Sequence, residues 1–193
     1  MKNSKGFTLI ELLAVIIILG VIMTVAIPNV IATLDRNKKD SMINDALRAI
    51  TSAKYTMRAN TEYEYPDDNT IVILPFKKLE NLDLEISPYD TYYSMNDSFV
   101  AITNESTDGG DSERVYYVHL VSCETEECST DDESLAQNRG INLVSEEDLG
   151  KSGKYDLIIK GLDLKMNLLT SGEGGKNEIS HMISGGLKNV VVY

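Results

Sequence analysis

The chain has 193 residues, of which 42% are hydrophobic and 25% charged, with only four prolines. This composition excludes a disordered chain and a multi-span membrane protein, and the length suits one globular domain plus an appendage. The formal net charge is −12. Residues 1–34 carry two lysines and one glutamate, so the acidity lies in the rest of the chain. Nucleic-acid binding is therefore not indicated, because it requires basic patches.

A long apolar run lies near the amino terminus. No charged residue occurs in the 23 residues from Leu12 to Leu34. A helix of that length spans about 35 Å, enough to cross a hydrocarbon core of about 30 Å. Lys2 and Lys5 precede the run and favour a cytoplasmic amino terminus. We therefore expect a transmembrane segment over residues 7–34, followed by a soluble part over residues 35–193.

Two other interpretations of this run remain open. A cleavable secretory signal would have an apolar region of about 7–15 residues and a small-x-small site. Candidate sites occur at residues 24–26 and 30–32, but the run is too long for such a signal. A plain membrane anchor fits the length better, yet it does not account for Glu11, since a carboxylate at membrane depth is costly.

The helical pattern continues beyond the apolar run, with polar residues on its other face. Its apolar positions are Met42, Ile43, Ala46, Leu47, Ala49, Ile50, Ala53 and Met57. We predict one helix from Phe7 to Ala59, about 80 Å long. Asn60 should end it, because asparagine tolerates the left-handed cap conformation. The amphipathic half, residues 35–59, should lie on the globular head.

Two residues weaken the apolar half of this helix. Gly20 costs about 1 kcal/mol relative to alanine. Pro28 lacks an amide donor and leaves the carbonyl of Thr24 without its helical partner. Either the pair produces an ordinary membrane-helix kink, or it marks a segment that unwinds when the environment changes.

The remainder alternates between strand-like runs and polar loops, which predicts an α+β head with a mostly antiparallel sheet packed on the amphipathic half-helix. The strand-like runs are Thr70–Phe76, Ser98–Thr103, Arg114–Ser122, Tyr155–Lys160 and Lys188–Tyr193. We expect the variable surface at Cys123–Lys154, with Gly172–Gly186 as a second loop. Tyrosines between residues 63 and 93 are expected to pack the domain, with an adhesive surface as the alternative.

Cys123 and Cys128 are the only cysteines. An even count in an exported chain predicts one disulfide, and two free thiols are the alternative. The closed loop is so short that the bond contributes only about 2 kcal/mol.

An acidic cluster surrounds the second cysteine and fits a solvated face better than a calcium site, because no calcium-loop motif is present. It comprises Glu124, Glu126, Glu127, Asp131, Asp132 and Glu133. His119 and His181 have no zinc spacing with the cysteines, so structural or surface roles are expected. No nucleotide loop or catalytic triad is recognisable, so neither an enzyme nor a cofactor is predicted.

The stretch KGFTLIELL at residues 5–13 closely resembles the processing site of type IV pilins and related pseudopilins. It has a basic leader, Gly6, then Phe7, and Glu11 four residues later. Gly20 and Pro28 also stand where many family members have glycine and proline. The resemblance covers residues 5–59, and the short leader and Ile-rich segment look more like those of Gram-positive, clostridial-like pilins than those of Gram-negative ones.

The resemblance implies a processing and assembly sequence. A prepilin peptidase would remove residues 1–6 by cutting between Gly6 and Phe7, and would N-methylate Phe7. The helix would stay in the cytoplasmic membrane until an assembly platform and its ATPase extract it into an extracellular fibre of pilin subunits. Glu11 would then pair with the new amine of a neighbouring subunit and set the helix stagger. The simpler alternative for Glu11 is complementing the helix dipole.

The expected function is therefore a structural subunit of a type IV pilus that serves adhesion, aggregation or twitching motility. A pseudopilin of a type II secretion or competence DNA-uptake machine is the alternative within the family. A membrane-tethered binding module that never polymerises is the alternative of another class.

Overall fold

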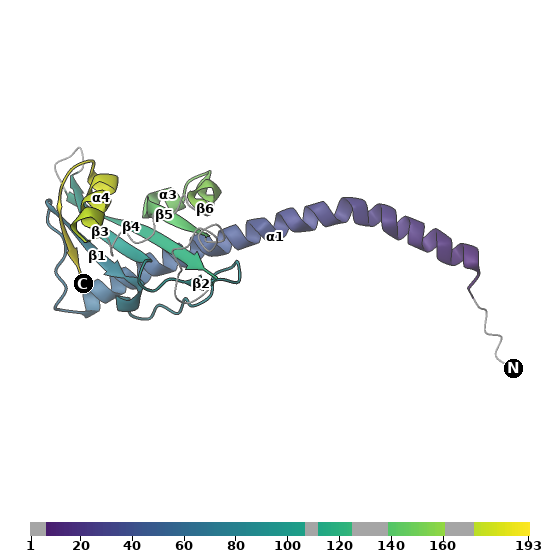
Figure 1. Cartoon of the computed structure of the whole chain (residues 1–193), viewed down its shortest axis with the longest axis horizontal. Helices are drawn as coiled ribbons and strands as arrows, with labels where there is room; N and C mark the ends of the chain where they lie inside the picture. Colours follow the sequence, from purple (N-terminus) through teal and green to yellow (C-terminus); the bar gives the residue numbers. More distant parts are fainter. Residues whose placement is uncertain (1–6, 107–111, 125–138, 161–171) are drawn as a thin grey trace. The chain divides into compact units, whose positions relative to one another are not determined.

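The computed structural model describes residues 7–106, 112–124, 139–160 and 172–193. The chain forms two compact units that divide after Lys38. Helix α1, Leu9–Ala59, begins in the first unit and ends in the second. Figure 1 labels α1 and, in the second unit, the strands and the short helices that accompany them. The predicted long helix and α+β architecture are confirmed.

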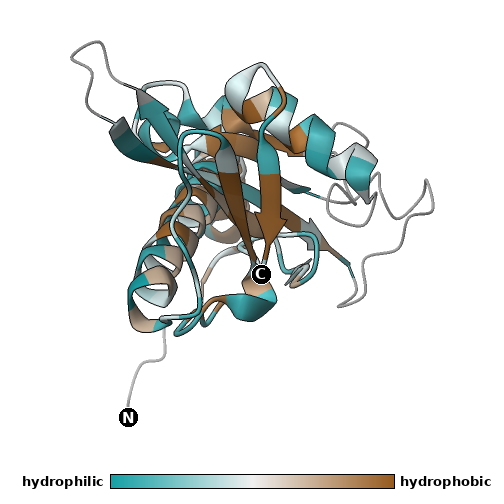
Figure 2. Ribbon diagram, turned by 90° about the vertical axis from the view of Figure 1, so that its left-hand side faces the viewer, coloured by the Kyte–Doolittle hydropathy of each residue, from teal (hydrophilic) through white to brown (hydrophobic). Residues whose placement is uncertain are grey.

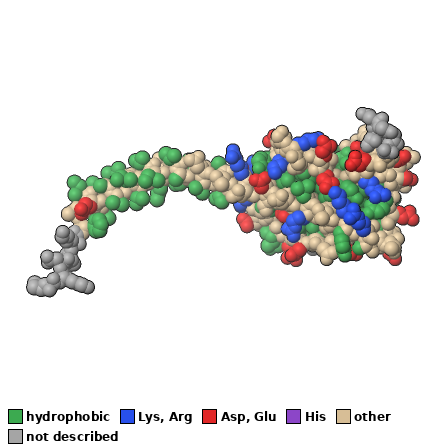
Figure 3. Space-filling view, turned by 180° about the vertical axis from the view of Figure 1, so that it is seen from behind, with side chains coloured by type: hydrophobic (Ala, Val, Ile, Leu, Met, Phe, Trp, Pro, Cys, Tyr) green, Lys and Arg blue, Asp and Glu red, His purple; other side chains and the backbone are tan. Residues whose placement is uncertain are grey.

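The first unit contains the apolar part of α1, which is not covered by any of the residues that the structure describes. Every large hydrophobic side chain from Phe7 to Leu34 is exposed, by 47% to 85%. Hydrophobic side chains cover this part of the helix in Figure 3. By length and composition, the helix is long and apolar enough to cross a membrane.

The second unit is built on a seven-stranded sheet in the order β6-β5-β4-β3-β1-β7, with β2 paired to β4. The strands are β1 Thr70–Pro75, β2 Tyr92–Tyr93, β3 Phe99–Ser106, β4 Ser112–Cys123, β5 Arg139–Ser145, β6 Ile158–Lys160 and β7 Asn189–Val192. All pairs are antiparallel except β1 with β7. The other helices in the described ranges are η1 Phe76–Lys78, α3 Glu146–Leu149, η2 Lys154–Leu157 and α4 Glu173–Ser184.

The sheet separates two apolar layers. On one face, the amphipathic half of α1 forms the larger core with alternate strand residues, because strand side chains alternate between faces. Its helix residues are Met42, Ile43, Ala46, Ala49, Ile50, Ala53 and Met57. On the other face, Ile179 of α4 packs with Ile71, Ile73 and Phe99. Figure 2 shows the hydrophobic strands between the two helices.

Asp40 and Asp45, in the half of α1 that belongs to the second unit, accept hydrogen bonds from tyrosines. The Tyr155 hydroxyl donates to Asp40 Oδ1 at 2.8 Å, and the Lys154 ammonium lies 3.1 Å from the same oxygen. These contacts hold the pKa of Asp40 below its ordinary value. The Tyr93 hydroxyl donates to Asp45 Oδ2 at 2.8 Å, and burial raises the pKa of that carboxyl.

Some local predictions require correction. The expected loop Gly172–Gly186 contains α4, which ends in a left-handed Gly185. Strand β5 lies within the expected surface segment Cys123–Lys154. The run Tyr155–Lys160 starts as η2 and only then becomes β6. Asn60 does follow the last helical residue, but its φ is not positive; its side chain instead accepts from the Glu62 amide at 2.9 Å.

His119 of β4 is almost completely buried and stacks on Phe99, with ring centroids 5.1 Å apart. Two residues of β5, Asn142 and Leu143, lie opposite it in a β-bulge, and Leu143 has a φ of 32°. Neither imidazole nitrogen has a hydrogen-bond partner among the described residues. Burial therefore lowers the pKa of His119 to about 4.

This burial predicts an acid-sensitive head. The unfolded chain binds the His119 proton at pH values where the folded chain does not, so stability falls as the pH drops from about 6.5 to about 4. Protonation of this one group lowers the free energy of unfolding by about 3 kcal/mol in total. Urea unfolding of the full chain in detergent, measured across this pH range, should show the slope of the free energy of unfolding against pH.

His119→Leu should flatten that slope, whereas His181→Gln on α4 should leave it unchanged. An equal pH dependence in the wild type and in His119→Leu would contradict the assignment.

Candidate processing and assembly site

The amino-terminal end of α1 is closed by a reciprocal cap between Thr8 and Glu11. The Thr8 amide and the Thr8 hydroxyl each donate to Glu11 Oε2 at 2.8 Å. The Glu11 amide donates back to Thr8 Oγ1 at 3.3 Å. This is a capping box, which satisfies amide donors that the first helical turn leaves without partners.

The cap gives Glu11 a role within its own chain, beyond complementing the helix dipole. It also uses only one side of the carboxylate. Both Thr8 bonds go to Oε2, and Oε1 accepts no hydrogen bond from the part of the chain that the structure describes. A second donor can therefore approach Glu11 without breaking the cap.

Thr8 contacts Glu11 but is not among the site residues predicted from the sequence. The signal was present, because Thr-x-x-Glu ahead of an apolar run is the sequence signature of a capping box. Glu11 stands out in the sequence because it is charged. The hydroxyl of Thr8, three residues earlier, explains the local geometry of the Glu11 side chain.

Phe7 and Thr8 precede the helix, and Phe7 is 85% exposed. Gly6 lies outside the described residues. The predicted cut between Gly6 and Phe7 therefore falls just before the point where α1 begins, and it stays a prediction.

Gly20 and Pro28 both lie inside α1, which runs through them. No atom outside the local helix lies within 4 Å of a Cβ placed on Gly20, so nothing in this chain requires a glycine there. Beside Pro28, the Asn29 side-chain amide donates to the Val25 carbonyl at 3.1 Å. The bond goes to Val25 and not to the Thr24 carbonyl, so it does not replace the donor that Pro28 lacks. Unwinding at these residues stays a prediction.

The other candidate residues lie on the head. Cys123 is buried at the end of β4, and no cysteine in the described ranges is free. Cys128 lies outside the described residues, as do all members of the acidic cluster except Glu124. The disulfide therefore stays a prediction. Within the described ranges, no group of three or more metal-ligating side chains converges.

Comparison with known proteins finds similarity in the amino-terminal region of the chain. Residues 1–27 match the family model of the prokaryotic N-terminal methylation motif. The chain is also 45% identical over 51 residues to the type IV wide pilus major component PilA4 of Thermus thermophilus. That match covers 25% of this chain and 39% of the relative's length. No solved structure matches the chain significantly.

The methylation motif, the match to a pilus component and the long apolar helix before an antiparallel sheet point to one class. In its amino-terminal region the chain is similar to type IV pilins, and its α+β architecture is pilin-like.

The cap predicts that Thr8→Ala destabilises the first turn of α1. Loss of an amino-terminal cap typically costs about 1 kcal/mol, so the amides of Leu12 and Leu13 should exchange about 5-fold faster. Hydrogen exchange of the full chain in detergent micelles measures this rate. Thr8→Ser should exchange like the wild type, and equal rates in the alanine and serine variants would rule out the cap.

Proposed function

We propose that this chain is a structural subunit of a type IV pilus, cleaved after Gly6, N-methylated at Phe7 and polymerised through the apolar half of α1. The observation that carries the proposal is the exposed apolar surface of residues 7–34, which none of the described residues covers. A membrane covers such a surface before assembly, and the same segments of neighbouring subunits cover it in a fibre.

Glu11 has two successive roles in this proposal. In the single chain it caps α1 through Oε2. Cleavage at Gly6 would create a cationic amine on Phe7, and the Oε1 atom of a neighbour's Glu11 would accept a charge-assisted hydrogen bond from it. In an apolar core such a pair mainly sets orientation, because both charges lose their hydration. The pair would thereby fix the stagger between helices.

A pseudopilin of a secretion or DNA-uptake machine would use the same helix and the same processing. The match to a major pilus component favours the pilus. A chain that never polymerises would keep its amino terminus and would not need the charge of Glu11.

Mass spectrometry of the mature chain tests the processing step. The proposal predicts an amino terminus at N-methylated Phe7. An intact Met1, or a start at Ile27 or Thr33, would contradict it.

Two substitutions of Glu11 separate its charge from its cap. Glu11→Gln keeps a capping side chain but removes the charge, whereas Glu11→Ala removes both. If intersubunit pairing is required, both variants should insert normally into the membrane and both should be about 10-fold depleted from sheared fibres, as expected for a charge-assisted contact.

Thr8→Ala is the matched control, since it weakens the cap and keeps the charge, and it should be depleted less than Glu11→Gln. Normal incorporation of Glu11→Gln would show that the cap alone matters.

A further inference from the structure

A polar hollow of about 380 Å³ lies beside the end of α4, where this helix meets β3 and β4. Its exposed lining residues are Asp68, Glu105 and Ser184, and Tyr117 and Lys188 are among those that are half-buried. The volume lies within the range of small-molecule sites, which begins at about 300 Å³.

Lys188, just ahead of β7, supplies a positively charged donor to this hollow. Its ammonium group donates to Thr103 Oγ1 at 3.2 Å and to the Asn104 carbonyl at 3.3 Å. Both acceptors are uncharged, and they hold the side chain in place. An ammonium carries three donors, so a third hydrogen remains available to a ligand.

Two carboxylates supply acceptors to the same hollow. The Tyr117 hydroxyl donates to Glu105 Oε1 at 2.6 Å, and the Ser112 hydroxyl donates to Asp68 Oδ1 at 3.4 Å. The other oxygen of each carboxylate, Glu105 Oε2 and Asp68 Oδ2, accepts no hydrogen bond from the described part of the chain. Each carboxylate is therefore oriented through one oxygen and available through the other.

This mixture of charges selects against simple ions. An anion would be repelled by the two carboxylates, and a metal ion would be repelled by the ammonium. A neutral ligand with several hydroxyl groups suits both kinds of group, because each hydroxyl donates one hydrogen and accepts through two lone pairs. Tyr117 and Ile183 add apolar area to the lining, which the carbon face of a sugar ring can cover.

We propose that the hollow between α4 and strands β3 and β4 binds a short neutral carbohydrate. Lys188 donates to one sugar hydroxyl, and Glu105 Oε2 and Asp68 Oδ2 accept from others. The site goes beyond the proposed pilus function, because all its residues belong to one head and binding requires no polymerisation. A fibre would repeat the site in every subunit, and repetition strengthens weak binding to a surface that carries many glycans.

A nuclear magnetic resonance titration of the full chain tests this site. The nitrogen-labelled chain is held in lauryldimethylamine oxide, a detergent without a sugar headgroup, and the probes are the methyl glycosides of galactose, mannose and N-acetylglucosamine. At least one probe should shift the amides of Glu105, Ser184 and Lys188 saturably. The expected Kd is about 1 mM, as for a ligand of this size with a few hydrogen bonds.

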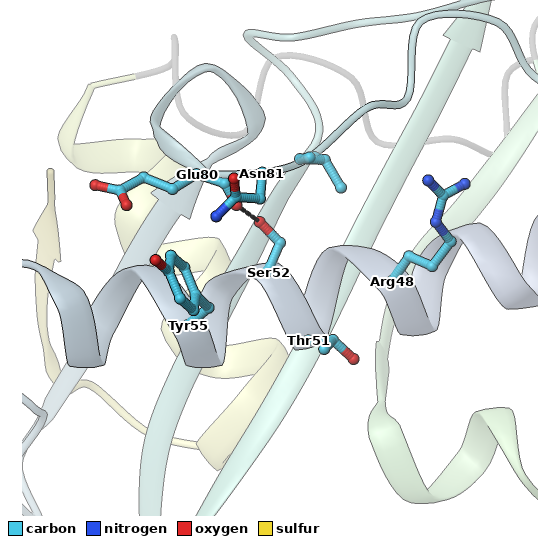
Figure 4. A pocket seen from close by; sticks show the side chains of 7 residues that line it. Arg48, Thr51, Ser52, Tyr55, Glu80 and Asn81 are labelled. Atoms are coloured by element: carbon cyan, nitrogen blue, oxygen red, sulfur yellow. Dashed lines mark hydrogen bonds between the residues drawn. The ribbon is translucent and has the colours of Figure 1, made fainter.

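Two variants test the role of the hollow. Glu105→Gln keeps an oxygen that accepts from Tyr117 but removes the charged acceptor, and it should weaken binding about 10-fold. Ser184→Trp fills the hollow and should abolish binding. Thr51 lines a separate groove between α1 and residues 80–82 (Figure 4), so Thr51→Trp is the matched control and should bind like the wild type. The dispersion of the amide spectrum shows whether each variant folds, and Glu105→Gln decides the test if Ser184→Trp unfolds.

The contrary outcomes are equally specific. The inference is overturned if none of the three glycosides causes saturable shifts at concentrations about 20-fold above the expected Kd. It is also overturned if Glu105→Gln binds like the wild type, or if inorganic phosphate or Ca²⁺ shifts these amides and the glycosides do not. Each of these results leaves the pilus function standing, and an unprocessed amino terminus would contradict the pilus function without affecting this site.

Discussion

An apolar helical surface that its own chain does not cover is the constraint on which this protein depends. Residues 7–34 present leucine, isoleucine and valine on all sides of α1. Leaving such an area in water is strongly unfavourable, so the surface must be covered by lipid or by other chains. The head is different, because its half of α1 is buried against a sheet. One helix thus combines a first half whose apolar surface needs lipid or other chains with a second half whose apolar face is already buried against the sheet.

Polar side chains make hydrogen bonds both at the start of this helix and in its second half. At its start, Thr8 and Glu11 satisfy amides that neither lipid nor apolar side chains can satisfy, and one oxygen of the carboxylate is left available. In the head, Asp40 and Asp45 accept hydrogen bonds from two tyrosines. Further along α1, Ser52 and Thr56 bind the backbone of Glu80, beside a surface groove. The same helix therefore carries the exposed apolar surface, the cap at its start and side chains that fix a loop of the head.

The sequence predicted most clearly what periodicity and local motifs encode. The apolar run and the positions from Met42 to Met57 gave the extent of α1 and its buried face. The processing motif indicated the family. Strand β5 was missed because Arg139–Ser145 contains a bulge and has no strict alternation. Helix α4 was missed because its two glycines resemble a loop, and only packing of Ile179 on the sheet shows it to be a helix. The pairing of β7 with β1 and the groove depend on contacts distant in sequence, which no local pattern contains.

In the proposed fibre, Glu11 finds its second partner in another subunit. A cryo-electron microscopy structure of the sheared fibre tests this pairing, because it shows the core helices and their amino termini together. Glu11 Oε1 should lie within about 4 Å of the methylated Phe7 nitrogen of a neighbouring subunit, the distance of an ion pair, with residues 7–34 enclosed. A fibre in which Glu11 contacts only Thr8 of its own chain, while the Phe7 amine points elsewhere, would contradict it.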